Sequence, residues 1–278
     1  MFGSKSIDYG SVCPSLWVID ADAFGNQFVF FWMNFIASHS NSLHYFSRRK
    51  GLEKMTPIAR AATILGVLEG TLSLPNLVKP KSDPFETLVI TIISQNTADT
   101  NTEKAFEALS KQFEIAPETL AKAEISAIES CLHVAGLYKN KARVIKEVSK
   151  IVLEEFGGSL APILILPLHE ARSKLMELPG VGPKTADVVL LFAAHQPTIP
   201  VDTHVYRVSK RLGFAPADAD YEAVRMSLQT LFEPKDYLAV HLLLIAHGRK
   251  TCKARRPLCR QCPVYAYCPS NWLGDMQR

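Results

Sequence analysis

Four cysteines near the C-terminus are the residues whose types and spacing most clearly suggest chemistry. Cys252, Cys259, Cys262 and Cys268 are separated by six, two and five residues. Four thiolates this close in sequence can converge on one inorganic centre. Zinc ribbons usually supply two C-x-x-C pairs, whereas this run contains one, and a cubane iron–sulfur cluster needs only four thiolates. The spacing predicts a metal centre and suits an iron–sulfur cluster better than zinc.

A glycine-rich hairpin is the second chemical feature. Residues 178–186 read LPGVGPKTA. Pro179 ends the preceding apolar helical pattern, and Pro183 suits the first position of the next helix. Two glycines allow a tight turn, for which we expect positive φ angles. Amides exposed at a helix N-terminus bind anions such as nucleic-acid phosphates. We therefore expect phosphate contacts here, although a plain interhelical turn is the alternative; the hairpin residues are Gly180, Val181 and Gly182.

Lys184 follows in the first turn of the next helix. The positive end of the helix dipole disfavours its ammonium form, and partial burial would lower its pKa further. A neutral amine at this place is a nucleophile that can form a Schiff base. A lysine that simply contacts phosphate is an equally acceptable interpretation of the residue type.

Asp202 lies eighteen residues beyond Lys184, in the segment Val201-Asp202-Thr203-His204. It is placed to cap the helix that follows. A carboxylate near Lys184 could also deprotonate the amine or stabilise positive charge on a sugar ring. We interpret His204 as an oriented core or interhelical histidine rather than as a catalyst.

The elements that must position these residues are almost all helices. Apolar periodicity begins at Met55, and strand-like alternation is nearly absent. The short apolar run 163–166 lies between two prolines and is predicted to be a loop. The fold class is therefore all-α. Predicted helices cover 55–68, 84–93, 101–113, 116–123, 126–133, 139–156, 168–177, 184–195, 203–212, 220–232 and 236–246.

The composition of the 278 residues allows a nucleic-acid partner without requiring one, because the net charge is +4 and the pI about 8.7. The six cysteines do not resemble a secreted disulfide framework, so Cys13 and Cys131 are expected to be free thiols in a reducing compartment. The apolar run Phe28–Ala37 is too short to span a bilayer.

Together these motifs resemble the endonuclease III branch of the helix–hairpin–helix DNA glycosylase superfamily. The hairpin with its lysine, the V-D-T-H segment and the C-x6-C-x2-C-x5-C tail occur in the family's order and spacing. The resemblance covers about residues 55–270 and leaves 1–54 as an N-terminal extension of unknown role.

The resemblance implies two helical domains with a DNA-binding cleft between them. A six-helix barrel with the hairpin would span 84–197. The second domain would combine 55–83 with 198–278 and carry a [4Fe–4S] cluster on a C-terminal loop. The four cysteines would be the ligands of this cluster, which in such enzymes is not the hydrolytic catalyst.

The resemblance also implies a reaction. Lys184 would attack C1′ of an extruded damaged nucleotide with the help of Asp202, leaving a Schiff base, and β-elimination would nick the strand. Similar adenine glycosylases usually carry serine at the lysine position, and mismatch thymine glycosylases often carry tyrosine. The lysine thus implies a bifunctional DNA glycosylase/AP lyase of base excision repair that removes oxidised pyrimidines.

Other DNA contacts are carried over from the family. Leu137 resembles the leucine of a wedge loop that enters the duplex opposite the extruded base, although a core leucine is the alternative. Residues 94–97 resemble the loop where the family places a glutamine in the gap. An ungapped alignment puts Asn96 on that position, but the amide of either Gln95 or Asn96 could hydrogen-bond the orphaned base, so both are candidates. Basic residues among the cysteines are expected to contact phosphates; they are Lys253, Arg255 and Arg256.

Two other hypotheses stay open at this point. One is a related glycosylase acting on mismatched thymine or another base, and the other is a non-catalytic DNA-binding iron–sulfur module. The expected partner is duplex DNA containing damaged bases or abasic sites. We expect a monomer without membrane contact, located inside the cell in the cytoplasm or nucleoid.

Overall fold

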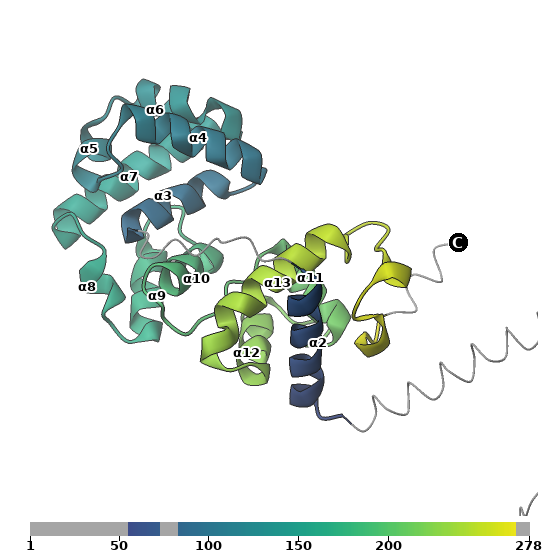
Figure 1. The fold of residues 1–278 in the computed structure, drawn as a ribbon. Helices are drawn as coiled ribbons and strands as arrows, with labels where there is room; N and C mark the ends of the chain where they lie inside the picture. Colours follow the sequence, from purple (N-terminus) through teal and green to yellow (C-terminus); the bar gives the residue numbers. More distant parts are fainter. Residues whose placement is uncertain (1–54, 73–82, 271–278) are drawn as a thin grey trace, which may run out of the picture. The chain divides into compact units, whose positions relative to one another are not determined.

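A computed structural model of the protein describes residues 55–72 and 83–270. Every regular element in these two ranges is a helix and no strand occurs in them, which confirms the all-α prediction (Figure 1). The α-helices are α2 (Pro57–Thr71), α3 (Pro84–Ser94), α4 (Asp99–Gln112), α5 (Pro117–Lys122), α6 (Ile125–Leu132), α7 (Tyr138–Phe156), α8 (Ala161–Leu164), α9 (Leu168–Glu177), α10 (Pro183–Phe192), α11 (Thr203–Leu212), α12 (Tyr221–Leu231) and α13 (Tyr237–Lys250). The 3₁₀ helices are η1 (His133–Ala135), η2 (Pro234–Asp236), η3 (Cys259–Gln261) and η4 (Tyr265–Tyr267).

Four of the α-helices in the described ranges begin behind a capping side chain: α2 behind Thr56, α3 behind Asp83, α11 behind Asp202 and α12 behind Asp220. Asp83 precedes α3, and its Oδ1 accepts hydrogen bonds from the amides of Phe85 and Glu86 at 2.9 Å each. Pro84 occupies the first turn, where its missing N–H has no helical partner to lose. One expectation was wrong. Ile163 and Leu164, predicted to lie in a loop, belong to the short helix α8. The helix can form because Pro162 stands in its first turn, where proline is tolerated. Both side chains are buried.

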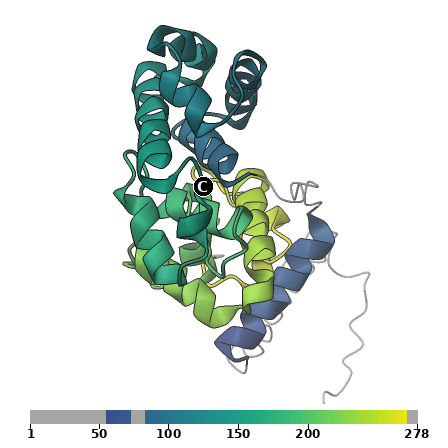
Figure 2. The same cartoon turned by 90° about the vertical axis from the view of Figure 1, so that its left-hand side faces the viewer.

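The helices pack around two hydrophobic cores. The first core draws its buried side chains from α3 through α10, between Phe85 and Leu190. The second core is formed by α2 and by the chain from Leu191 to Val264. Within the second core α13 packs on α2 and α11 (Figures 1 and 2). Helix α10 contributes to both cores: Ala186, Val189 and Leu190 belong to the first, and Leu191 at its C-terminal end belongs to the second.

The hairpin between α9 and α10 depends on Gly180 and not on Gly182. Gly180 has a φ of +72°, and a Cβ there would lie 2.7 Å from Val144 Cγ1 on α7. Gly182 has a φ of −94°, so the expected positive φ is wrong for this residue. A Cβ on Gly182 would meet nothing within 4 Å. The first glycine thus lets the hairpin dock on α7, and the second leaves the N-terminus of α10 open.

No helix within the described ranges is long and apolar enough to cross a membrane. The expectations for residues 1–54, including Cys13 and the run Phe28–Ala37, lie outside the described residues.

The two hairpin glycines should respond differently to alanine. We expect Gly180→Ala to destabilise the protein by about 2 kcal/mol, roughly 4 to 8 °C in Tm, because it combines a left-handed backbone with an overlap on Val144. Gly182→Ala is the matched control and should cost at most about 1 kcal/mol, since alanine is only a poorer N-cap. Thermal unfolding of both variants checks this, and equal losses would contradict it.

Candidate active site and cysteine pocket

Lys184 lies in the first turn of α10, directly behind the hairpin. Its side chain is half-buried. Burial lowers the pKa of the Lys184 amine, and the negative charges of Asp202 and Asp99 act in the opposite direction. Because burial is the larger effect, the neutral amine is more populated than for a lysine in water. The structure thus brings the predicted lysine into the electrostatic reach of the predicted carboxylate.

Asp202 caps α11 as the sequence predicts. Its Oδ1 accepts hydrogen bonds from the amides of His204 at 2.8 Å and Val205 at 2.7 Å. Both bonds fix the carboxylate at the helix start. Within the described residues, no hydrogen bond reaches the other oxygen, Oδ2, so Asp202 keeps an acceptor for a further group.

A buried carboxylate that sequence reasoning missed anchors the segment leading to Asp202. Asp187 lies one turn after Lys184 on α10 and is fully buried. Its oxygens accept hydrogen bonds from Arg172 Nε at 2.9 Å, Thr198 Oγ1 at 2.8 Å and the Tyr221 hydroxyl at 2.7 Å. The Tyr221 oxygen in turn accepts the amide of Val201 at 3.3 Å. The chain preceding Asp202 is therefore tied to the helix that carries Lys184.

His241 holds the same segment from α13. Its Nδ1 lies 2.9 Å from the carbonyl oxygen of Pro200, and the ring packs edge-on against Phe192. Burial lowers the pKa of His241 to about 4, although the charge of Asp202 opposes this. The imidazole is thus neutral near pH 7, with Nδ1–H as the donor to Pro200. No sign of this role is visible in the sequence, because His241 is one of two histidines in an apolar helix and no local motif distinguishes it.

His204 is an interhelical residue, as expected. Its Nδ1 lies 3.2 Å from Arg207 NH2. A Cβ on Gly248 of α13 would come within 3.0 Å of the His204 Cβ, so α11 and α13 approach each other closely there. Arg207 extends the contact, because its guanidinium donates to the carbonyls of Gly248 and Cys252.

An ion pair connects the start of α4 with the last turn of α13. Arg249 NH1 lies 2.5 Å from Asp99 Oδ2, and NH2 donates to Oδ1 at 3.1 Å. Both side chains are half exposed, so the pair adds little stability on its own. Its carboxylate nevertheless contributes to the field at Lys184.

The candidate gap-filling residues take unusual backbone conformations. Asn96 and Leu137 have φ angles of +53° and +47°, in the left-handed region that favours glycine. Asn96 is exposed, and Leu137 is 66% exposed, so it is not a core leucine. The amide of Gln95 is engaged instead: its Nε2 donates to the Gly180 carbonyl at 3.0 Å. Of the two neighbouring amides, Asn96 is the one that faces solvent.

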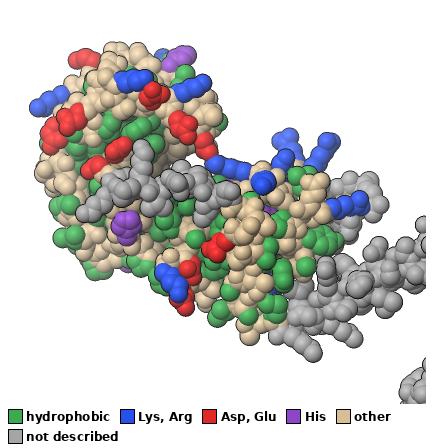
Figure 3. Space-filling model, viewed as in Figure 1, with side chains coloured by type: hydrophobic (Ala, Val, Ile, Leu, Met, Phe, Trp, Pro, Cys, Tyr) green, Lys and Arg blue, Asp and Glu red, His purple; other side chains and the backbone are tan. Residues whose placement is uncertain are grey.

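The basic residues among the cysteines are exposed on a fixed loop. Lys253, Arg255 and Arg256 all project into solvent, and basic side chains gather over the end of α13 and the following loop (Figure 3). Arg211 NH1 donates to the Lys253 carbonyl at 2.7 Å, and NH2 to that of Ala254 at 3.1 Å. These bonds hold the loop backbone against α11.

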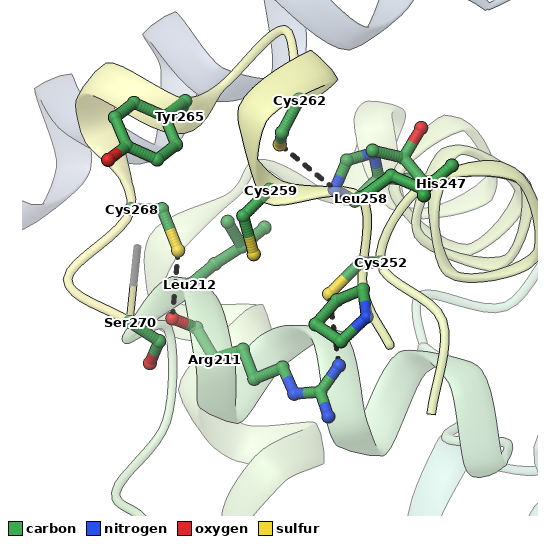
Figure 4. A pocket seen from close by; sticks show the side chains of 12 residues that line it. Arg211, Leu212, His247, Cys252, Leu258, Cys259, Cys262, Tyr265, Cys268 and Ser270 are labelled. Carbon is green, nitrogen blue, oxygen red and sulfur yellow. Dashed lines mark hydrogen bonds between the residues drawn. The ribbon is translucent and has the colours of Figure 1, made fainter. Parts of the chain in front are cut away.

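The four C-terminal cysteines line one pocket. It encloses about 410 Å³ of empty space, part of it open to solvent, and the four sulfurs turn toward it (Figure 4). In the described ranges no three His, Cys, Asp or Glu side chains are close enough to hold a single metal ion. The cysteines share this pocket with Arg211, Leu212, His247, Thr251, Pro257, Leu258, Tyr265 and Ser270.

Polar groups surround the sulfurs. Arg211 NH1 donates to Cys252 Sγ at 3.5 Å, and the Cys268 thiol donates to the Arg211 carbonyl at 3.3 Å. His247 Nε2 lies 3.8 Å from Cys262 Sγ. Burial raises the pKa of Cys262 to about 11 and that of Cys268 to about 12. Such thiols lose their protons near neutral pH only if a positive centre lies among them.

Comparison with known proteins defines the class to which this fold and site belong. The sequence profile of the HhH-GPD superfamily base excision DNA repair proteins matches residues 89–234, just over half of the chain. Endonuclease III of Sulfolobus acidocaldarius is 40% identical over 185 residues, which cover 66% of this chain and 81% of the relative. Endonuclease III of Thermotoga maritima is 35% identical over 188 residues, covering 68% and 84%.

Solved structures agree. A trapped endonuclease III–DNA covalent intermediate, an estranged-adenine complex, has a TM-score of 0.69 at 30% identity and covers 80% of this chain and 100% of that one. A thermostable thymine-DNA glycosylase, with a TM-score of 0.62 at 23% identity, shares the fold. The chain belongs to the HhH-GPD superfamily of base excision DNA repair proteins, in its endonuclease III branch. It is a DNA glycosylase/AP lyase, which confirms the predicted family and enzyme class.

Proposed function

We propose that Lys184 is the nucleophile of this DNA glycosylase/AP lyase and that Asp202 assists it. The observation that carries the proposal is the half-buried amine at the start of α10, behind the hairpin and within the field of Asp202. Burial supplies the neutral amine that the attack requires. The substrate is duplex DNA that carries a damaged pyrimidine or an abasic site.

In the proposed reaction the Lys184 nitrogen forms a bond to C1′ of the extruded nucleotide. The glycosidic bond breaks, and its electron pair leaves with the base, which takes up a proton. The amine loses a proton. The C1′–O4′ bond of the sugar then breaks, O4′ keeps the electron pair and takes up a proton, and an imine remains between Lys184 and C1′. Removal of a proton from C2′ then expels the 3′ phosphate and nicks the strand.

The electrostatic role fits Asp202 better than removal of the lysine's proton. The charge of Asp202 raises the pKa of Lys184, so in the free enzyme it stabilises the positive form of the amine. The same field would stabilise positive charge that develops on the sugar as the base departs. Oδ1 is held by two amides, which preorganises the carboxylate for this purpose.

Replacing Lys184 tests the nucleophile. Borohydride reduction of the wild-type protein on an abasic duplex is expected to yield a covalent protein–DNA adduct, and Lys184→Ala should yield none, because the imine nitrogen is missing. Lys174→Ala, which removes an exposed lysine of α9 paired with Glu177, should trap like wild type. An undiminished adduct with Lys184→Ala would refute the assignment.

Asp202→Asn tests whether the negative charge of Asp202 acts on Lys184 and on the sugar. Asparagine caps helices as well as aspartate does, so we expect stability close to wild type. The rate of base excision should fall about 100-fold or more. Only the neutral amine attacks, so imine formation rises with pH through the Lys184 pKa. Loss of the negative charge lowers that pKa further, and the rising limb of the pH–rate profile should move to lower pH. A limb that stays in place in single-turnover trapping would contradict the proposed field.

We propose that three parts of the surface hold the DNA. The open amides at the N-terminus of α10, next to Gly180, Val181 and Gly182, suit a phosphate. Exposed Asn96 and Leu137 suit the gap left by the extruded base, whereas Gln95 supports the hairpin. The basic loop suits the phosphates of a flanking segment; it presents Lys253, Arg255 and Arg256.

Oxidised or fragmented pyrimidines are the proposed lesions, because a lysine nucleophile resembles the pattern of the enzymes that remove them. A panel of duplexes, each with one lesion, separates this from the alternatives. Preferential excision of a mismatched thymine or of an oxidised purine would replace the proposed substrate and leave the role of Lys184 intact.

The pocket supports a [4Fe–4S] cluster held by the four cysteines. Four cysteine sulfurs turned toward one space suit a cubane cluster, which takes one thiolate at each of its four irons, and the run has only one of the two C-x-x-C pairs that zinc sites usually supply. Arg211 supplies an N–H to Cys252, and hydrogen bonds to sulfur are typical of such sites. The four cysteines would hold the cluster as thiolates, whose negative charges the irons would stabilise in place of the lost protons, and this ligation would fix the loop that carries the basic residues.

Cys259→Ser should abolish the broad absorbance at about 400 nm expected of the purified protein. It should also lower the thermal stability, since metal binding and local folding are coupled. Cys131→Ser is the matched control: this buried thiol lies 3.0 Å from Gln112 Oε1, outside the pocket, and its loss should leave the colour unchanged. A colourless wild type with stoichiometric zinc would overturn the cluster and not the glycosylase.

We propose that the chain divides into a barrel domain over 84–197 and a cluster domain from 55–83 plus 198–278. The presence of two hydrophobic cores supports this division. We propose that DNA binds between these domains. The monomeric state and the reducing compartment stay predictions, which size-exclusion chromatography and cell fractionation test.

A further inference from the structure

A buried lysine outside the active site connects two loops. Lys141 lies on α7 and is only 3% exposed. Its ammonium donates to the Ile93 carbonyl at 2.7 Å, to Thr97 Oγ1 at 2.5 Å and to the Ala135 carbonyl at 2.9 Å. All three N–H donors are therefore used. Thr97 closes the arrangement, because its hydroxyl donates to Ala135 at 2.5 Å.

The partners of Lys141 explain how a cation is tolerated here without a carboxylate. Ile93 is in the last turn of α3, and Ala135 ends η1. Carbonyls at helix C-termini lack helical partners and carry partial negative charge. The ammonium satisfies such carbonyls from two elements at once. Burial lowers the pKa of Lys141, which shows that placing the charge here has a cost.

The two loops that meet at Lys141 each carry one exposed non-glycine residue with a positive φ; among the described residues, His195 and Arg256 are the other two. Residues 95–98 connect α3 to α4 and contain Asn96, and residues 136–137 connect η1 to α7 and contain Leu137. A left-handed backbone in a bulky residue such as leucine costs about 1 to 2 kcal/mol and persists only where its surroundings hold it. Thr97 is the neighbour of Asn96, and Ala135 lies two residues before Leu137. Lys141 therefore hydrogen-bonds to the chain close to both residues.

We propose that Lys141 is a positioning residue that holds the two loops in one register, so that Asn96 and Leu137 enter the DNA duplex as a unit. The inference rests on the proposed function, since it needs both side chains to occupy the gap left by the extruded nucleotide. Lys141 touches neither DNA nor the reacting atoms. It acts on base extrusion, which precedes the chemistry at Lys184.

Lys146 on the same helix offers a matched control. Its amine donates to the carbonyl of Ala123, which ends α5, so it too binds a helix C-terminus from α7. This contact lies at the C-cap of α5 and on neither loop. Lys141→Met and Lys146→Met thus remove the same chemical group from one helix, and they differ in whether the loops lose their connection.

The test compares two DNA substrates. We expect Lys141→Met to lower excision of a lesion from duplex DNA by about 10- to 100-fold, because a misplaced side chain near a reaction has effects of this size. Trapping on an abasic site in single-stranded DNA, where no partner strand leaves a gap, should stay within about threefold of wild type. Lys146→Met should leave both unchanged. Equal losses of Lys141→Met on both substrates, or no loss on either, would overturn the proposal.

A double-mutant cycle adds a readout that a general loss of stability would not move. If Lys141 acts through Asn96 and Leu137, adding Lys141→Met to the Asn96→Ala/Leu137→Ala variant should make that variant little worse on duplex DNA. Multiplying effects would instead mean that the residues act independently and would refute the proposal.

A milder pair of variants covers poor folding of Lys141→Met. Thr97→Val removes the hydroxyl that bridges Lys141 and Ala135, and Thr97→Ser keeps it. We expect faster amide hydrogen exchange in 95–98 and 133–137 together for Thr97→Val only. Exchange that rises in one loop alone would overturn the coupling. Failure of wild type to trap any abasic DNA would refute the proposed function, whereas unchanged exchange in Thr97→Val would refute only the role of Lys141.

Discussion

The half-buried amine of Lys184 is the constraint on which the rest of the site depends. A lysine in water is protonated at neutral pH and cannot attack a sugar carbon. Burial at the start of α10 favours the neutral form, whereas a close carboxylate would restore the charge. The protein meets both demands by using the Asp202 carboxylate as a helix cap, which orients it and leaves burial as the larger effect.

This balance requires that α10 and the start of α11 keep a fixed distance, and buried polar contacts provide that. Asp187 lies on the helix of Lys184. It accepts hydrogen bonds from Thr198, which is in the segment before Asp202, and from Tyr221, whose oxygen accepts the Val201 amide. His241 adds a bond to Pro200 from the other side. Arg172 pairs with this buried carboxylate, and removing the guanidinium would leave an uncompensated buried charge that strongly destabilises the protein. Such a network is stiff, as a preorganised site must be.

The sequence could predict the residues whose meaning is local. The helices and the cap at Asp202 follow from apolar periodicity and from side chains that bond their own neighbours along the chain. The shared pocket of the four cysteines follows from their spacing. Asp187, His241 and Lys141 could not be predicted, because their partners lie far away in sequence and nothing local distinguishes them. Gly182 shows the same limit: its type allowed a positive φ, but the hairpin needed only one such residue.

Asn96 and Leu137 are two surface residues with a strained backbone. Asn96 and Leu137 are left-handed although neither is glycine, and a glycine would remove the strain at both positions. A glycine would also remove the side chain, and the leucine side chain is largely exposed in the free protein. Conformations that cost energy and contribute little packing are best explained by a partner that the side chains meet outside the protein. The buried contacts of Lys141 and Thr97 lie beside both residues and can bear this cost, so under the proposed function rigidity within the first core would serve recognition of DNA at its surface.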